Sequence, residues 1–196
     1  MAKEKRREQI LHQARKVFAD KGYHRTSISE IVSRCGVAQG TFYLYFGSKR
    51  DVFEALLDEF TAAVYRAFFI PGAEDVKTKE QVRQRLTQAS QSALKMLAGN
   101  KDLAKIFLVE TVPREPGFEE KVASFYNRLV ADTAANLELW MDRGLLRHAD
   151  PAVIANCVIA MTERLTLQWM NGALPGDFKE IADQIVKFEL HGIMAD

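Results

Sequence analysis

Cysteine is scarce in this chain. Among its 196 residues only Cys35 and Cys157 are cysteines, and they lie far apart without the close spacing of metal-binding pairs. This scarcity argues against a disulfide framework and favours a reducing compartment. We expect each thiol to behave as a small, buried apolar side chain.

Long hydrophobic runs are lacking as well. The longest apolar stretches, such as residues 153–161, are too short and too interrupted to span a bilayer. The first residues are basic with no apolar run behind them, so we expect no secretory signal. Because 47% of the residues are hydrophobic and 27% charged, we expect a soluble cytoplasmic protein with no membrane partner.

Motifs of catalysis and cofactor binding are missing too. The four histidines are scattered, and there is no His-Glu-x-x-His pattern, glycine-rich phosphate loop or Gly-x-Ser-x-Gly elbow. We therefore expect no enzyme activity, no cofactor and no metal site. Glu110 and Glu163 sit on apolar helices and could form a buried pair, a ligand anchor or salt bridges. Turnover on a panel of esters and phosphoesters would revive the enzyme hypothesis.

Charge is distributed unevenly along the chain. Residues 1–50 hold eleven lysines or arginines and four acids, a net charge of +7, whereas the other 146 residues carry a net charge of −6. A basic segment joined to an acidic body indicates a polyanionic partner for the first part only. A solvated charged face would produce the same asymmetry, so charge alone leaves both interpretations open.

The helical period dominates the sequence, and no strand-like alternation bounded by hairpin turns is present. We therefore predict an all-α fold of about nine helices. It comprises a three-helix head over residues 1–50 and a helical-bundle body over residues 51–196. Capping residues, glycines and prolines place the helices, in chain order, at about 5–21, 28–35, 39–46, 48–69, 78–97, 101–112, 118–143, 151–171 and 177–194.

The second and third helices have helix-turn-helix dimensions. Ser27 and Glu30 have capping-box spacing at the start of the second, and a short turn at 36–38 contains a glycine. Two helices this short need a third beneath them, which residues 5–21 supply. Phe42 and Phe46 should be buried against Ile31 and Phe18, which leaves an outward face made of Gln39, Thr41, Tyr43 and Tyr45.

That outward face suits DNA. Gln39, Gly40 and Thr41 open a short helix, where backbone N–H groups and short side chains can approach the duplex. Glutamine can pair bidentately with adenine, and threonine offers both a hydroxyl and a methyl group. Lys49, Thr26 and Ser27 are placed for phosphates. Two alternatives stay open: the tyrosines could be packing residues with solvated hydroxyls, and Gln39 could contact phosphate rather than a base.

These residues closely resemble the TetR family of bacterial regulators over about residues 8–60. Val32 replaces the more common alanine of the family pattern. The elements that carry the resemblance are Thr26-Ser27, Ile31-Val32, Gly36-Val37, Gln39-Gly40, Tyr43-Leu44-Tyr45-Phe46, Lys49 and Asp51.

The resemblance implies a homodimer on a pseudo-palindromic double-stranded DNA operator. Family members usually repress transcription and release DNA when a small molecule enters the C-terminal body. Carried over residue by residue, base contacts fall to Gln39, Gly40, Thr41 and Tyr43, and phosphate contacts to Thr26, Ser27, Tyr45 and Lys49.

Two further sets of residues are candidates in the body. Pairing the last two long helices across a twofold axis would give an intersubunit four-helix bundle. The dimer stripe consists of Val153, Cys157, Ala160, Arg164, Ile181, Ile185 and Phe188. The candidate side chains for binding a small hydrophobic effector are Phe107, Phe125, Leu129, Met161, Leu165 and Trp169.

Both sets could instead be plain core of the body. Residues 97–104 and 169–171 look like the fatty-acyl-CoA-responsive branch of the family, which implies a long-chain acyl-CoA as the effector. A pure protein-interaction module is the remaining rival, and it would require the basic head to bind DNA no better than an equally charged control.

Overall fold

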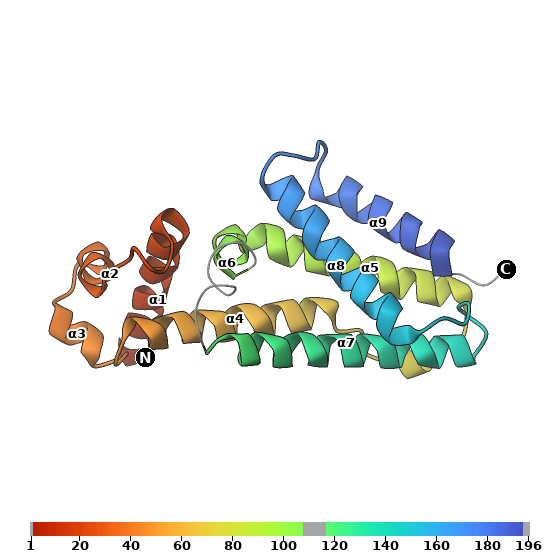
Figure 1. The fold of residues 1–196 in the computed structure, drawn as a ribbon, viewed down its shortest axis with the longest axis horizontal. Coiled ribbons are helices and arrows are strands. Elements are labelled where there is room, and N and C mark those ends of the chain that lie inside the picture. The colour runs from red at the N-terminus through yellow and green to blue at the C-terminus, as the bar shows by residue number, and fades with distance from the viewer. Residues whose placement is uncertain (1, 108–116, 194–196) are drawn as a thin grey trace. The chain divides into compact units, whose positions relative to one another are not determined.

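The computed structural model describes residues 2–107 and 117–193, and these are all α, as predicted (Figure 1). No helix in these ranges is long and apolar enough to cross a membrane. A short 3-10 turn occupies Ala73–Asp75. The α-helices are α1 (Ala2–Lys21), α2 (Ile28–Cys35), α3 (Gln39–Tyr43), α4 (Lys49–Phe68), α5 (Lys79–Gly99), α6 (Lys101–Lys105), α7 (Glu119–Asp142), α8 (Pro151–Met170) and α9 (Phe178–Ile193).

Most predicted helix bounds lie within a few residues of those observed, but α3 ends three residues early. The N–H groups of Leu44 and Tyr45 donate to the carbonyls three residues back, at 3.3 and 2.9 Å. Such bonds tighten the chain into a 3-10 turn and end the regular helix. The last parts of the predicted helices 101–112 and 177–194 lie outside the described residues.

The chain divides into two compact units, residues 1–62 with 100–119 and residues 63–99 with 120–196. The helix-turn-helix segment therefore shares a unit with the first part of α4 and with α6. Lys105 Nζ donates to the carbonyl of Ala19 at 3.0 Å, which fixes α6 to the end of α1. The functional division at residue 50 remains a prediction.

Aromatic rings form the centre of the first unit. The Phe53 ring lies 4.7 Å from Tyr23, 5.1 Å from Phe107 and 5.0 Å from Phe118, measured between centroids. All four side chains are buried. Rings at these separations gain pair energy beyond the burial of their area. Residues far apart in the sequence are thus held in one core.

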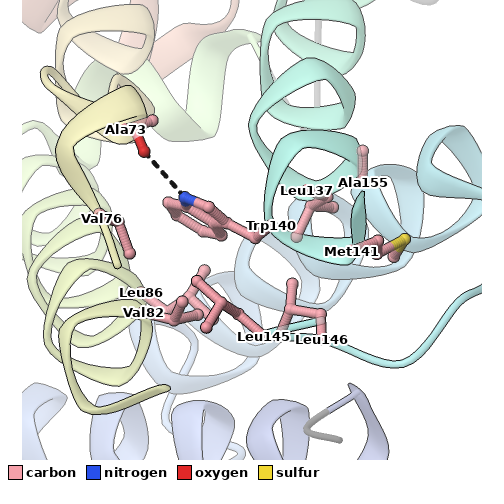
Figure 2. Packing of buried hydrophobic residues seen from close by; sticks show 10 residues of the cluster. All are labelled: Ala73, Val76, Val82, Leu86, Leu137, Trp140, Met141, Leu145, Leu146 and Ala155. Carbon is pink, nitrogen blue, oxygen red and sulfur yellow. Dashed lines mark hydrogen bonds between the residues drawn. The ribbon is translucent and has the colours of Figure 1, made fainter. Parts of the chain in front are cut away.

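The second unit is a bundle in which α5 packs against α8 and α9 (Figure 1). Figure 2 shows the Trp140 ring buried among aliphatic side chains, with its Nε1–H donating to the carbonyl of Ala73 at 3.0 Å. Arg143 donates to the carbonyls of Glu74 and Val76 at 2.8 and 2.7 Å. Residues 73–76, between α4 and α5, are therefore held by the end of α7 and the residue that follows it.

The two cysteines are unlike each other. Cys35 is buried between α1 and α2, as predicted, and its thiol faces the carbonyl of Gln9 at 3.9 Å. The prediction that Cys157 is buried is wrong, because it lies on the solvent-facing side of α8. Both thiols are free.

Candidate nucleic-acid interface

The start of α2 is a capping box, as the spacing predicted. The N–H of Glu30 donates to Ser27 Oγ at 3.3 Å, and the N–H of Ser27 donates to Glu30 Oε2 at 2.9 Å. The ammonium of Lys21 on α1 also donates to this carboxylate. Lys21, followed by the Ser27 backbone, lowers the pKa of Glu30 to about 2. The cap and the ion pair together fix the start of α2 against α1.

The turn between α2 and α3 depends on Gly36. Its φ of 65° is the left-handed conformation that side chains disfavour, and its N–H closes the end of α2. Ala38, which precedes α3, has no polar side chain to cap the helix. The first N–H groups of α3 are therefore left without a side-chain acceptor.

The third helix, α3, has one buried face and one exposed face. Phe42 is fully buried and Phe46 nearly so, whereas Tyr43 keeps 51% of its surface exposed. Gln39 and Gly40 are exposed. These placements confirm the predicted facing, although Thr41 and Tyr45 are only half-buried rather than fully outward.

Gly40 is not required by the fold. A Cβ built at this position meets no atom within 4 Å, and the backbone conformation is an ordinary helical one. The missing side chain leaves the start of α3 open on its outer side. A glycine that internal packing does not need is typical of a place where another molecule approaches the backbone closely.

Two residues predicted to contact phosphates have partners inside the head. Thr26 is 3% exposed, and its hydroxyl donates to the carbonyl of Gly22 at 2.8 Å. The Lys49 ammonium donates to the carbonyls of Tyr23 and Thr26, both at 2.8 Å, and lies 4.3 Å from the centre of the Tyr23 ring. Both residues thus hold the segment between α1 and α2.

We predict that Lys49→Met destabilises the protein instead of only weakening DNA binding. The substitution removes a charged donor shared by two carbonyls, so the free energy of unfolding should fall by about 1–3 kcal/mol. Chemical denaturation measures this. Arginine should not restore stability, because its planar guanidinium cannot occupy the position of a compact ammonium. A stable Lys49→Met variant whose DNA affinity depends less on salt would instead support a phosphate contact.

The sequence did not single out two further residues at the surface of the head. Leu44, beside Tyr43, is 73% exposed, and an apolar side chain there can meet thymine methyl groups. Arg7 on α1 places its guanidinium 5.2 Å from the centre of the Phe46 ring. The signals were an apolar residue directly after the polar face of α3 and the basic run that begins α1.

The predicted dimer stripe is only partly on the surface. Its members on α8 are exposed, as is Phe188 on α9 at 72%. Ile181 and Ile185 are 7% and 2% exposed because they pack with Leu94 of α5 in the unit's own core. They form the floor of a groove of about 400 Å³ between α8 and α9, and Phe188 lines it as well.

The candidate effector residues do not all share one place. Phe107 belongs to the aromatic core of the first unit. Met161, Leu165 and Trp169 of α8 pack on the same buried cluster of α5 and α9, and Met161 and Leu165 also line the groove. Phe125 is half-buried, and Leu129 is buried.

Polar groups accompany these apolar side chains. The Tyr126 hydroxyl donates to a Glu163 carboxylate oxygen at 2.7 Å, and burial raises the pKa of Glu163. The Thr162 hydroxyl is fully buried and has no hydrogen-bond partner among the residues described. The sequence signalled Glu163 as an acid on an apolar helix, whereas nothing in it signalled Tyr126. Glu110 lies outside the described residues.

Comparison with known proteins places these features in context. The sequence pattern of the bacterial regulatory proteins of the tetR family matches residues 10–56. The chain is 30% identical over 146 residues to the uncharacterized HTH-type transcriptional regulator YezE of Bacillus subtilis (strain 168), which covers 72% of this chain and 69% of that protein.

Two further matches concern fatty acids. The chain is 34% identical over 102 residues to the fatty acid metabolism regulator protein of Bacillus subtilis (strain 168), across 52% of this chain and 50% of that one. The crystal structure of the transcriptional regulator FadR from Bacillus subtilis in complex with stearoyl-CoA has the same fold. Its TM-score is 0.74 at 22% identity, with 94% of this chain and 98% of that chain covered.

Proposed function

Because the chain belongs to the tetR family of bacterial regulatory proteins and is a transcriptional regulator, we propose that it represses transcription as a homodimer on a pseudo-palindromic operator. A small hydrophobic effector, such as a long-chain acyl-CoA, would release it. The observation that carries the DNA-binding part is the outer face of α3, which presents Gln39, Gly40 and Tyr43 above the buried Phe42.

The proposed contacts follow the placement of each side chain. Base contacts are assigned to the exposed Gln39, Gly40 and Tyr43 and to the half-buried Thr41. We expect α3 to enter the major groove. Ser27 at the start of α2 and Tyr45 after α3 are assigned to phosphates. The intramolecular partners of Thr26 and Lys49 favour a supporting role for these two residues.

A dimer is proposed because a single small head covers too little DNA for tight and specific binding. Two heads about 34–36 Å apart would read two half-sites one helical turn apart. The exposed stripe Val153, Cys157, Ala160, Arg164 and Phe188 on α8 and α9 supports an isologous interface. Exposed Val153 and Phe188 are the kind of apolar side chains that a partner surface covers.

The effector proposal rests on the body and on the relatives. Met161 and Leu165 of α8 flank Thr162 and Glu163 in the chain, so this helix carries both apolar and polar side chains. The Glu163 carboxylate accepts from Tyr126 of α7, and the Thr162 hydroxyl has no partner among the described residues. A regulator similar to this chain is named for fatty acid metabolism, and a solved structure of the same fold holds stearoyl-CoA. We therefore assign effector binding to residues 51–196.

Selection of bound sequences from a random duplex library at physiological salt tests the DNA-binding proposal. A homodimer should enrich a pseudo-palindrome whose half-sites are spaced by about one helical turn. Absence of enrichment, together with binding no tighter than that of an equally charged control protein, would favour the protein-interaction module instead.

The selected operator then tests the effector. We predict that palmitoyl-CoA raises the thermal midpoint of the protein and lowers its affinity for the operator by about 5–150-fold, the usual range of allosteric coupling. Decanoyl-CoA and acetyl-CoA serve as length controls. If palmitoyl-CoA changes neither the midpoint nor operator affinity, the acyl-CoA assignment is wrong while the DNA-binding proposal stands.

A further inference from the structure

A second groove, of about 180 Å³, lies in the second unit between the end of α4 and the middle of α5. Arg66 and Arg85 line it from the two helices, and the polar side chains of Gln88 and Ser92 extend along α5. The ring of Phe69 forms part of the wall. The groove thus combines two guanidinium groups, two hydrogen-bonding side chains and one aromatic surface.

The two arginines have no acidic partner among the described residues. Two other arginines of this unit are engaged: Arg83 pairs with Glu80, and Arg143 donates to backbone carbonyls. Arg66 and Arg85 form no ion pair with any described residue. Residues 51–196 carry a net negative charge, and this groove is lined by two arginines that form no ion pair with a described residue.

Guanidinium groups bind oxyanions such as phosphates and carboxylates. The planar fork of arginine donates two parallel hydrogen bonds to phosphate oxygens, and it is only weakly hydrated. Gln88 and Ser92 can donate to the remaining oxygens. A groove of this volume is large enough for a phosphate with part of the group that carries it. The chemistry of the lining therefore points to a phosphorylated ligand group.

The aromatic wall narrows the class of ligand. Phe69 is 51% exposed, and its ring stacks on Tyr65 at 5.9 Å with an interplanar angle of 23°. The Tyr65 hydroxyl donates to Asp132 at 2.5 Å, and Arg128 lies 4.7 Å from the Tyr65 ring centre. Phe69 is thus supported from within the unit and presents its exposed surface at the groove, where a nucleobase can stack.

We propose that this groove binds the phosphorylated adenosine end of a coenzyme A thioester. Arg66 and Arg85 would hold its phosphates, Gln88 and Ser92 would complete the hydrogen bonds, and the adenine would stack on Phe69. The inference rests on the acyl-CoA effector proposed above and assigns its headgroup to named residues. It also assigns the coenzyme A headgroup and the acyl chain to different residues, because the acyl chain is assigned to other side chains of the body.

The test measures the dissociation constants of the full-length protein by calorimetry, with palmitoyl-CoA, palmitate and adenosine 3′,5′-bisphosphate as separate probes. The Arg66→Gln/Arg85→Gln variant should bind palmitoyl-CoA at least tenfold more weakly and palmitate unchanged. Phe69→Leu should weaken adenosine 3′,5′-bisphosphate but leave inorganic phosphate unchanged. Lys179→Gln/Lys187→Gln removes the same charge from exposed sites on α9, which does not line the groove, and should bind every probe like the wild type.

The outcomes are distinct. Equal affinity of the wild type and the arginine variant for palmitoyl-CoA would overturn the inference while leaving the effector proposal intact. An arginine-dependent site for adenosine 3′,5′-bisphosphate in a protein whose operator binding ignores palmitoyl-CoA would support the headgroup site and refute the effector. Binding of inorganic phosphate as tightly as the nucleotide would overturn the adenosine assignment. Unchanged thermal midpoints confirm that each variant is folded.

Discussion

Phe188→Asp should dissociate the dimer and lower affinity for the operator by at least about a hundredfold. Linking two binding modules raises affinity by about 10²–10⁴ over that of one module, and a monomer loses this gain. Phe188 is 72% exposed in the protomer, so its replacement costs the isolated fold little. A buried aspartate on each side of a twofold interface would place two like charges together without partners.

Analytical ultracentrifugation and a gel-shift titration measure the two parts of this prediction. Lys95→Asp is the matched control, because it also introduces a carboxylate at an exposed helical site, on α5 outside the groove between α8 and α9. The control should remain dimeric and bind DNA normally. A Phe188→Asp protein that sediments as a dimer would place the interface elsewhere on the body.

Gly40→Ala should lower the affinity for DNA without lowering the stability of the protein. A methyl group at this position meets no protein atom, and alanine is favoured over glycine in a helix by up to about 1 kcal/mol, so the variant should be at least as stable as the wild type. The same methyl group would stand between α3 and the DNA. At about 1–3 kcal/mol per half-site, two heads should lose roughly thirtyfold or more in operator affinity.

Gly99→Ala provides the control for this substitution. Gly99 is the last residue of α5, its φ is not positive, and a Cβ there also meets nothing within 4 Å. Both variants should keep or raise the thermal midpoint, and only Gly40→Ala should lose operator binding. Normal operator affinity of Gly40→Ala would mean that DNA does not approach the start of α3 closely.

Interactions between residues close in the sequence made the structure of the head predictable. The Ser27–Glu30 capping box and the left-handed Gly36 depend on residues within three or four positions of each other, so spacing alone predicted them. The helical period likewise placed Phe42 inside and Gln39 outside, because a helix of known register has a known inner face. The end of α3 escaped prediction, since either helix type can close its last turn.

Long-range contacts decided what the sequence left open. Lys49 binds carbonyls more than twenty residues earlier, so only the folded head shows that its ammonium holds the segment before α2. Likewise, only the folded structure shows that the ring of Phe107, a candidate for the effector site, packs 5.1 Å from that of Phe53.

The same difference between local and long-range interactions explains which features of the body were predicted. Periodicity marked Cys157 and Ile185 as members of apolar stripes on α8 and α9, but it could not say which stripe faces a neighbouring helix and which faces solvent. Packing of α9 on α5 buries Ile185 at 2% exposure and leaves Cys157 outside. The sequence by itself determined which helices form and which faces are apolar. The tertiary structure decided which apolar faces meet, because burial depends on residues brought together from distant parts of the chain.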